Sequence, residues 1–131
     1  MNISDIEKTL PNGFRGSVLR KITVNNRAYE LKLFLDIDVS EPGNEQSVTK
    51  RGIIIVKDLV YFIVNDSEAD ILSTIARGIN ISESGTVESL KADLYIPGPF
   101  VEEAFRHYFF MPDFGEYIFV SGKDCQFELE E

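Results

Sequence analysis

The residues from Arg51 to Asn65 form the most apolar stretch of the chain, and any stable fold has to bury most of them. They are rich in β-branched and aromatic side chains, which pack well on a pleated, half-buried surface. The two continuous runs in it, Ile53–Val56 and Leu59–Val64, are too apolar for a strand with one face in water and too β-branched for a comfortable helix. The stretch therefore predicts either a buried pair of strands or one long strand that bends near Lys57–Asp58.

An alternating pattern before this stretch predicts a hairpin. The even-numbered side chains from Val18 to Val24 are expected to share one face, and Asn25-Asn26 is typical of a two-residue turn. The return strand, Tyr29 to Val39, carries apolar residues at its odd positions and mainly polar ones between them. At about 3.3 Å per residue it is long enough that we expect a bulge or strong coiling. The segment Ser40 to Lys50 is predicted to be an exposed loop.

After the central stretch, the sequence predicts a helix and several short strands. Ser67 can cap a helix that Gly78 would end. Ile79–Ile81 is expected to be a short strand and Ser82–Gly85 a turn, while Leu90–Ile96 alternates like a half-buried strand.

The last third predicts aromatic strands. One helical turn is expected at Phe100–Glu103, followed by strands at Phe105–Met111 and Tyr117–Val120. Gly122–Asp124 is expected to turn the chain into a final strand, Cys125–Glu130, whose odd-numbered residues face inward.

Together these elements predict a single domain over residues 1–131. The fold class is mainly β, a β-rich α+β fold: a mostly antiparallel sandwich or a strongly curled sheet with one or two short helices. Side chains within the densest apolar runs are expected in the core: Leu33, Ile55, Phe62, Phe109 and Phe119.

Charge and composition restrict the function classes. The formal net charge of −9 disfavours nucleic-acid binding, because phosphates would be repelled. One cysteine excludes an intramolecular disulfide, and no Cys/His cluster has zinc-ligand spacing. The start of the chain has no signal-peptide profile, and no apolar run approaches the roughly 18 residues of a membrane span. We therefore expect a soluble cytoplasmic protein that needs no cofactor and does not bind membranes.

Few residues offer catalytic chemistry. His107 is the sole histidine and has no partner nearby in sequence to orient it as a base. Cys125 alternates with apolar residues, which favours an inward-facing small side chain over a nucleophile. Asp36 and Asp38 share a strand face and would need Asp58 or Glu30 to hold a cation, whereas a solvated sheet face explains them as well. The sequence therefore predicts no catalytic or metal site.

Three segments resemble, in order and spacing, a family of small uncharacterised bacterial proteins: Leu10–Ser17, Lys50–Ile53 running into Leu59–Phe62, and His107–Phe114. Members typically open with Leu-Pro-x-Gly-Phe-His-Asp-Ala and close with an aromatic strand, an Asn-Asp-Trp-like turn and a final strand. Some similar sequences are described as immunity proteins of bacterial toxin systems. This chain has Arg15-Gly16 in place of the family's His-Asp pair, the only pair in that motif that could ligate a metal or move a proton. The resemblance thus implies shared architecture and, at most, an immunity-like role.

Two function classes remain open. The first is a non-enzymatic domain that binds another, basic protein through acidic residues of predicted loops: Glu41, Glu45, Glu83 and Asp113. The second is a small-molecule-binding or enzymatic β domain with a pocket formed by aromatic and polar residues: Arg106, His107, Tyr108 and Tyr117. We favour the first, because the sequence does not assemble a nucleophile, a base and an orienting group.

Overall fold

The computed structural model describes residues 2–41, 43, 45–64, 79–81, 83–86, 104–111 and 116–130. Within them lies one short helix, α1 (Ile3–Glu7), and a seven-stranded sheet. The strands in chain order are β1 (Val18–Asn25), β2 (Glu30–Asp38), β3 (Thr49–Val64), β4 (Ile79–Asn80), β5 (Glu83–Thr86), β6 (Phe105–Met111) and β7 (Glu116–Leu129).

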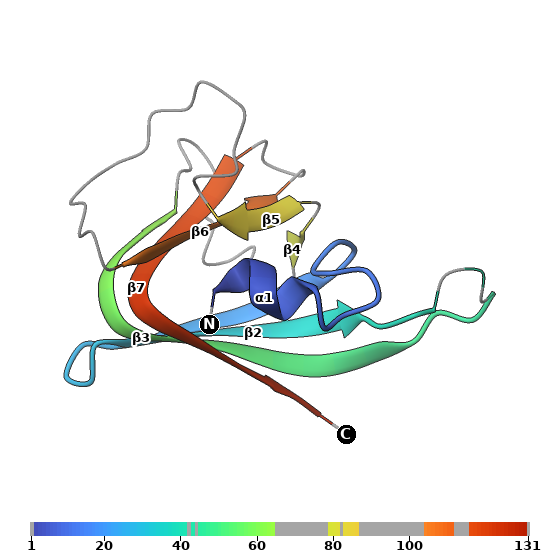
Figure 1. Cartoon of the computed structure of the whole chain (residues 1–131), viewed down its shortest axis with the longest axis horizontal. Helices are drawn as coiled ribbons and strands as arrows, with labels where there is room; N and C mark the ends of the chain where they lie inside the picture. The colour runs from blue at the N-terminus through green and yellow to red at the C-terminus, as the bar shows by residue number, and fades with distance from the viewer. Residues whose placement is uncertain are drawn as a thin grey trace.

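The sheet is antiparallel at every pairing between described strands, in the order β4-β1-β2-β3-β7-β6-β5. It is open, and it curls so strongly that β5 and β6 lie above β1–β3 (Figure 1). The predicted mainly-β fold class is confirmed, in its curled-sheet form.

The curl is made by two long strands that bend together. β3 runs without a break through Asp58, whose φ of 50° bends it, and its register against β7 shifts between Leu59 and Tyr61. Of the two predicted alternatives, a pair of strands or one long strand that bends near Lys57–Asp58, the second is confirmed. The turn predicted at Gly122–Asp124 is wrong: these residues continue β7, opposite the bend in β3. Glycine is needed at position 122 because β3 comes too close there for a side chain, and not because the chain reverses direction.

The concave side of the sheet holds the main core, and α1 lies on it, between β5 and the strands β2 and β3 (Figure 1). The helix buries Ile3 and Ile6 against the core, and its first turn is closed by a capping box between Asn2 and Asp5. A hydrogen bond from the Ser84 hydroxyl to the Glu7 carboxylate ties α1 to β5. The sequence analysis did not predict this helix, because it is only five residues long and stable only through tertiary packing.

The second half of β3 packs against an apolar cluster on each face. Phe62 packs with Val120 toward the main core, whereas Tyr61 joins Tyr108 and Phe119 in a second cluster on the opposite face. This explains the uninterrupted apolar run from Leu59 to Val64, since a strand with one wet face would alternate. Of the predicted core residues, Leu33, Ile55, Phe109 and Phe119 are buried, while Phe62 is only half-buried.

The first hairpin differs from its prediction at two points. Its loop has four residues instead of two, because the Asn25 side chain accepts hydrogen bonds from the backbone N–H groups of Arg27 and Ala28. Tyr29, expected to face inward, therefore lies in that loop and is 65% exposed. A β-bulge at Arg20 shifts the register of β1, so that Leu19 points into the core and the expected common face of Val18 to Val24 is broken.

Two further expectations concern short segments. The turn predicted at Ser82–Gly85 is wrong, because Glu83–Thr86 pairs with β6 as strand β5. The predicted loop after β2 is confirmed for its described residues up to Val48, and β3 begins at Thr49. The helix expected from Ser67 to Gly78, the strand Leu90–Ile96 and the turn Phe100–Glu103 lie outside the described residues. In the described part of the chain, no helix has the length and apolar character needed to span a membrane.

Candidate functional site

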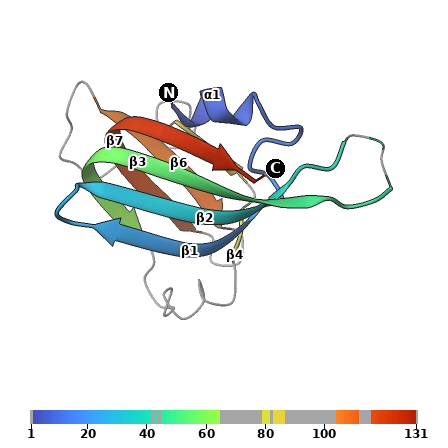
Figure 2. The same cartoon turned by 90° about the horizontal axis from the view of Figure 1, so that it is seen from below.

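Of the four acidic residues predicted to bind a partner, the three in the described part of the chain lie on two separate elements. Glu41 and Glu45 are exposed in the loop that projects beyond the sheet between β2 and β3 (Figures 1 and 2). The backbone of Glu83 lies in β5, an edge strand that is separated from β3 by β7 and β6 in the sheet order. Asp113 is outside the described residues. Their role in binding a basic protein stays a prediction.

The alternative pocket residues are split between two faces of β6. His107 and Tyr108 are consecutive, so their side chains point to opposite sides of the sheet, and both are buried. His107 stacks against Phe105, with ring centroids 6.3 Å apart, whereas Tyr108 belongs to the cluster with Tyr61 and Phe119. Arg106 is half-buried on the same face as Tyr108, and the backbone of Tyr117 pairs with Phe110 on β6. The structure does not bring His107 and Tyr108 together in one site.

The two aspartates considered for a cation have other partners. The Asp36 carboxylate accepts a hydrogen bond from Arg20 Nε at 2.6 Å, and Asp38 accepts one from the backbone N–H of Ser40 at 3.0 Å. Hydrogen bonds from Ser40 lower the pKa of Asp38. Across the residues that the structure describes, no group of three or more His, Cys, Asp or Glu side chains is arranged to hold a metal ion.

Cys125 faces the main core and is 1% exposed, as its alternation predicted. Burial raises the pKa of the thiol to about 12. Since only the thiolate is nucleophilic, about one molecule in ten thousand would be reactive at pH 8.

We therefore expect Cys125 to react with iodoacetamide at pH 8 at least about a hundredfold more slowly in the folded protein than in guanidinium chloride. Mass spectrometry of timed samples measures both rates. Similar rates in the two conditions would mean that the thiol is open to solvent and available for chemistry.

The outer face of the sheet carries two adjoining hollows. This convex side of β1, β2, β3 and β7 faces away from α1 and the main core (Figure 2). One hollow has a volume of about 500 Å³, and a smaller one of about 240 Å³ adjoins it at Arg51 and Ile53. We call the two together the outer groove. Its lining residues are Arg20, Phe34, Leu35, Asp36, Arg51, Gly52, Ile53, Glu128, Leu129 and Glu130.

Strand register creates the outer groove. Lys21, Phe34, Ile53 and Glu128 are direct cross-strand neighbours on β1, β2, β3 and β7, and form a first row. A second row lies two residues further along β2, β3 and β7, where Asp36, Arg51 and Glu130 are neighbours. Arg20, at the bulge of β1, joins this row through the ion pair of its side chain with Asp36. Side chains two residues apart on a strand share a face, so the groove runs between the rows, across the strands.

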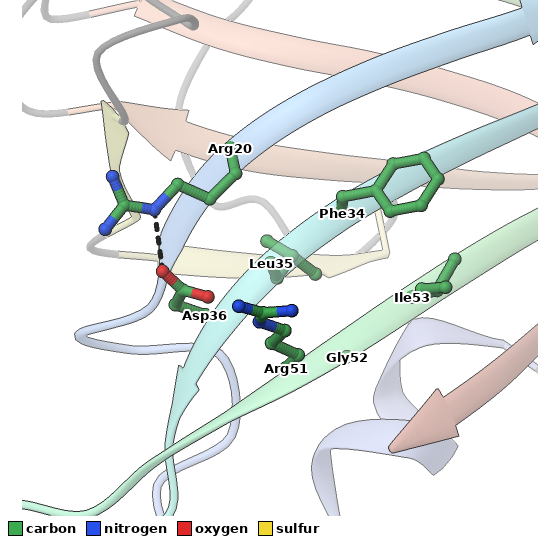
Figure 3. Close-up of a pocket in the computed structure, with 7 residues that line it drawn as sticks. All are labelled: Arg20, Phe34, Leu35, Asp36, Arg51, Gly52 and Ile53. Atoms are coloured by element: carbon green, nitrogen blue, oxygen red, sulfur yellow. Dashed lines mark hydrogen bonds and ion pairs between the residues drawn. The ribbon is translucent and has the colours of Figure 1, made fainter. Parts of the chain in front are cut away.

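The charges in the outer groove are only partly paired. Arg20 is bound to Asp36, and the Lys21 ammonium lies 5.4 Å from the centroid of the Phe34 ring. Arg51 extends from β3 over β2 beside Asp36 and Leu35 (Figure 3), yet its guanidinium makes no ion pair with any described residue. The groove therefore offers a cation beside an apolar floor.

Sequence reasoning missed this site because the rows depend on pairing between strands that are far apart in the chain. One local signal was present. Phe34 interrupts the otherwise polar even-numbered positions of the strand from Tyr29 to Val39. A single outward apolar residue is common, and only the pairing of Phe34 with Ile53 on β3 makes a larger apolar patch.

Comparison with known proteins assigns the chain to no family. Its described residues form an open and strongly curled antiparallel sheet with one helix. No family model matches the sequence, and no curated protein matches it. One solved structure that aligns with it is that of an uncharacterized protein from Neisseria gonorrhoeae, at 16% sequence identity and a TM-score of 0.44. The alignment covers 88% of this chain and 92% of the other.

Proposed function

We propose that this protein is a non-catalytic domain that binds another protein, and that the outer groove is its docking surface. The observation that carries the proposal is the combination of an outward Phe34 and Ile53 with an Arg51 guanidinium that has no ion-pair partner among the described residues. Aromatic residues and arginine are enriched where proteins bind one another, because they combine large contact area with directed hydrogen bonds.

The length of the outer groove favours a peptide segment as its occupant. It crosses from β1 to β7, which spans three strand spacings of about 4.8 Å each, or roughly 14 Å. An extended chain covers about 3.3 to 3.6 Å per residue, so about four residues of a partner fit along it. The overall charge of −9 and the glutamates at the β7 end oppose a nucleic-acid occupant.

The proposal includes the absence of a catalytic role, and the burial of the most reactive side chains supports this part of it. Cys125 and His107, the residues with the most versatile chemistry, are each 1% exposed and do not line the outer groove. The residues that do line it can bind and orient a partner through charge and apolar contact. We also propose a cytoplasmic location, where one reduced cysteine is ordinary.

A different observation supports a second contact, in which an acidic loop binds a basic protein. Glu41 and Glu45 are exposed in a loop that projects beyond the sheet, and the chain has a net charge of −9. An immunity-like role, which the family resemblance implies, is one form of this contact: the partner would be a toxin with a basic surface. Its association rate should fall as salt rises, because charges more than about 8 to 10 Å apart are screened at physiological ionic strength.

The docking surface can be tested by placing a photo-crosslinking amino acid at Phe34 in the source cells. We expect it to capture a protein that, once purified, binds the unmodified domain. Replacing Phe34 by Asp should weaken that binding at least about tenfold, because a carboxylate would replace the apolar floor of the groove.

Tyr29→Asp is the matched control. Tyr29 is an exposed aromatic residue in the hairpin loop, so the same chemical change there should leave affinity unaltered. Circular dichroism should show that both variants keep the fold. Failure to capture any protein at Phe34, or equal loss of affinity in both variants, would remove the outer groove as the docking surface.

A further inference from the structure

The outer groove has an uneven distribution of charge. At its β1–β3 side, two cations have no ion pair with described residues: Lys21, which lies over Phe34, and Arg51. At its β7 side, Glu128 and Glu130 are both exposed. Of these two, Glu130 accepts a hydrogen bond from the backbone N–H of Arg51 at 2.7 Å, while Glu128 stands beside Ile53 in the first row. A ligand lying along the groove would meet positive charge, an apolar floor and negative charge in that order.

The neighbouring charges on the same face do not remove this asymmetry. Arg20 and Asp36 neutralise one another, and the Glu30 carboxylate is held by Lys57 and Lys32. The hydrogen bond from Lys57 lowers the pKa of Glu30, so this carboxylate is ionised at neutral pH and balances its lysine neighbours. The Arg51 guanidinium, which extends over β2, thus remains as a fork of donors beside Phe34 and Ile53 (Figure 3).

From this arrangement we infer that the outer groove recognises a peptide segment in which a carboxylate side chain is followed, about three residues away in either chain direction, by a basic side chain, with apolar residues between them. The carboxylate binds Arg51, the apolar side chains lie on Phe34 and Ile53, and the basic group meets Glu128. The spacing follows from the position of the Arg51 guanidinium over β2 (Figure 3), because β2 and β7 are two strand spacings of about 4.8 Å apart and about three extended residues span that roughly 10 Å. The inference rests on the proposed function, since it names the partner segment of the same docking surface.

Arginine suits this role because its planar fork can donate two parallel hydrogen bonds to one carboxylate. Such a charge-assisted contact is selective for a carboxylate over the isosteric amide. Inorganic phosphate could also approach a single arginine, but it would make no use of the apolar floor or of Glu128.

The experiment is a titration of the 15N-labelled domain, followed by two-dimensional NMR. The probe is the peptide acetyl-Ser-Glu-Leu-Val-Lys-Ser-amide, and its matched control has Gln in place of Glu. We expect the Glu peptide to shift the backbone signals of Phe34, Arg51, Ile53 and Glu128. The Gln peptide should bind about tenfold more weakly, as expected for a charge-assisted bidentate contact.

Variants of the domain identify the side chain that binds the carboxylate of the peptide. Arg51→Gln should weaken binding of the Glu peptide about tenfold and leave the Gln peptide unchanged. Arg27→Gln removes an equal charge from the exposed hairpin loop and should change neither affinity. Signals outside the groove should keep their positions in both variants, which shows that each is folded.

Three outcomes would overturn the inference. Equal binding of the Glu and Gln peptides at the groove would reject the carboxylate while leaving the groove as a docking surface. Shifts of Arg51 by inorganic phosphate at the same concentration as the peptide would reduce the site to a simple anion contact. No shift at the groove with either peptide would reject this partner segment, whereas capture of a protein at Phe34 would still decide the proposed function separately.

Discussion

Replacing Gly122 by alanine is expected to lower the free energy of unfolding by about 3 kcal/mol. A Cβ atom at this position would lie 2.4 Å from Val56 Cγ1 and 2.8 Å from the backbone oxygen of Lys57. Protein interiors are close-packed and tolerate little added volume, and overpacking typically costs 1 to 3 kcal/mol, or roughly 10 °C in Tm at the upper end for a domain of this size. The upper end applies because a backbone oxygen in a paired strand cannot move aside as a side-chain end can. Chemical denaturation of both proteins measures the difference.

Gly43→Ala supplies the control for this prediction. Its added Cβ would meet no atom within 4 Å, so only its positive φ of 84° opposes the change, at a cost of about 1 kcal/mol. A second variant, Gly122→Ala combined with Val56→Ala, removes the contact with the side chain and keeps the contact with the Lys57 oxygen. If Gly122→Ala were no more costly than Gly43→Ala, the two strands would not approach one another at the bend as the structure has them.

The bend at Asp58 and Gly122 also shows where local sequence reasoning stops. Gly122-Lys123-Asp124 has the composition of a turn, and composition is all that a sequence window contains. The requirement for glycine comes from Val56 and Lys57, more than sixty residues earlier in the chain, through the pairing of β3 with β7. The opposite case is β2, where strict alternation alone placed Leu31, Leu33, Leu35 and Ile37 in the core.

Prediction therefore succeeded where a pattern repeats within one strand. It failed where contacts with a distant segment determine the local conformation. The mainly antiparallel fold and the inward Cys125 followed from periodicity and apolar density. The bent central strand was one of two alternatives that the same patterns allowed. The bulge at Arg20 and the four-residue hairpin loop did not, because the side-chain hydrogen bonds of Asn25 and the register with β2 compete with simple alternation.

The candidate site was harder to foresee than the fold. Each residue that makes the outer groove is unremarkable in its own segment: Arg20 and Phe34 belong to the hairpin, Arg51 to the start of the central stretch and Glu128 to the end of the chain. Antiparallel pairing of four strands places them in adjacent rows. The acidic residues named from the sequence were chosen for their loop positions, and the loop containing Glu41 and Glu45 is indeed exposed. Exposure, unlike convergence of side chains, can be inferred from composition.

The second large effect is expected from Phe109→Ala, which should destabilise the protein by about 3 to 5 kcal/mol. Phe109 is 1% exposed, and its ring meets that of Phe14 edge to face, with centroids 6.1 Å apart. Removing it would leave a cavity where β6 packs against the turn that precedes β1, so both the transfer energy of the ring and the aromatic contact would be lost. Urea denaturation followed by circular dichroism measures the loss.

Phe105→Ala is a matched control for Phe109→Ala, because it removes the same side chain from the same strand. Phe105 is 37% exposed at the other end of β6, where water can fill the space that its ring leaves. Its substitution should cost about 1 kcal/mol or less, mainly through the lost stacking on His107. The difference between the two variants isolates the contribution of the core that α1, β6 and the sheet enclose. Equal losses would mean that Phe109 is not packed between them, and that the sheet does not curl over the helix.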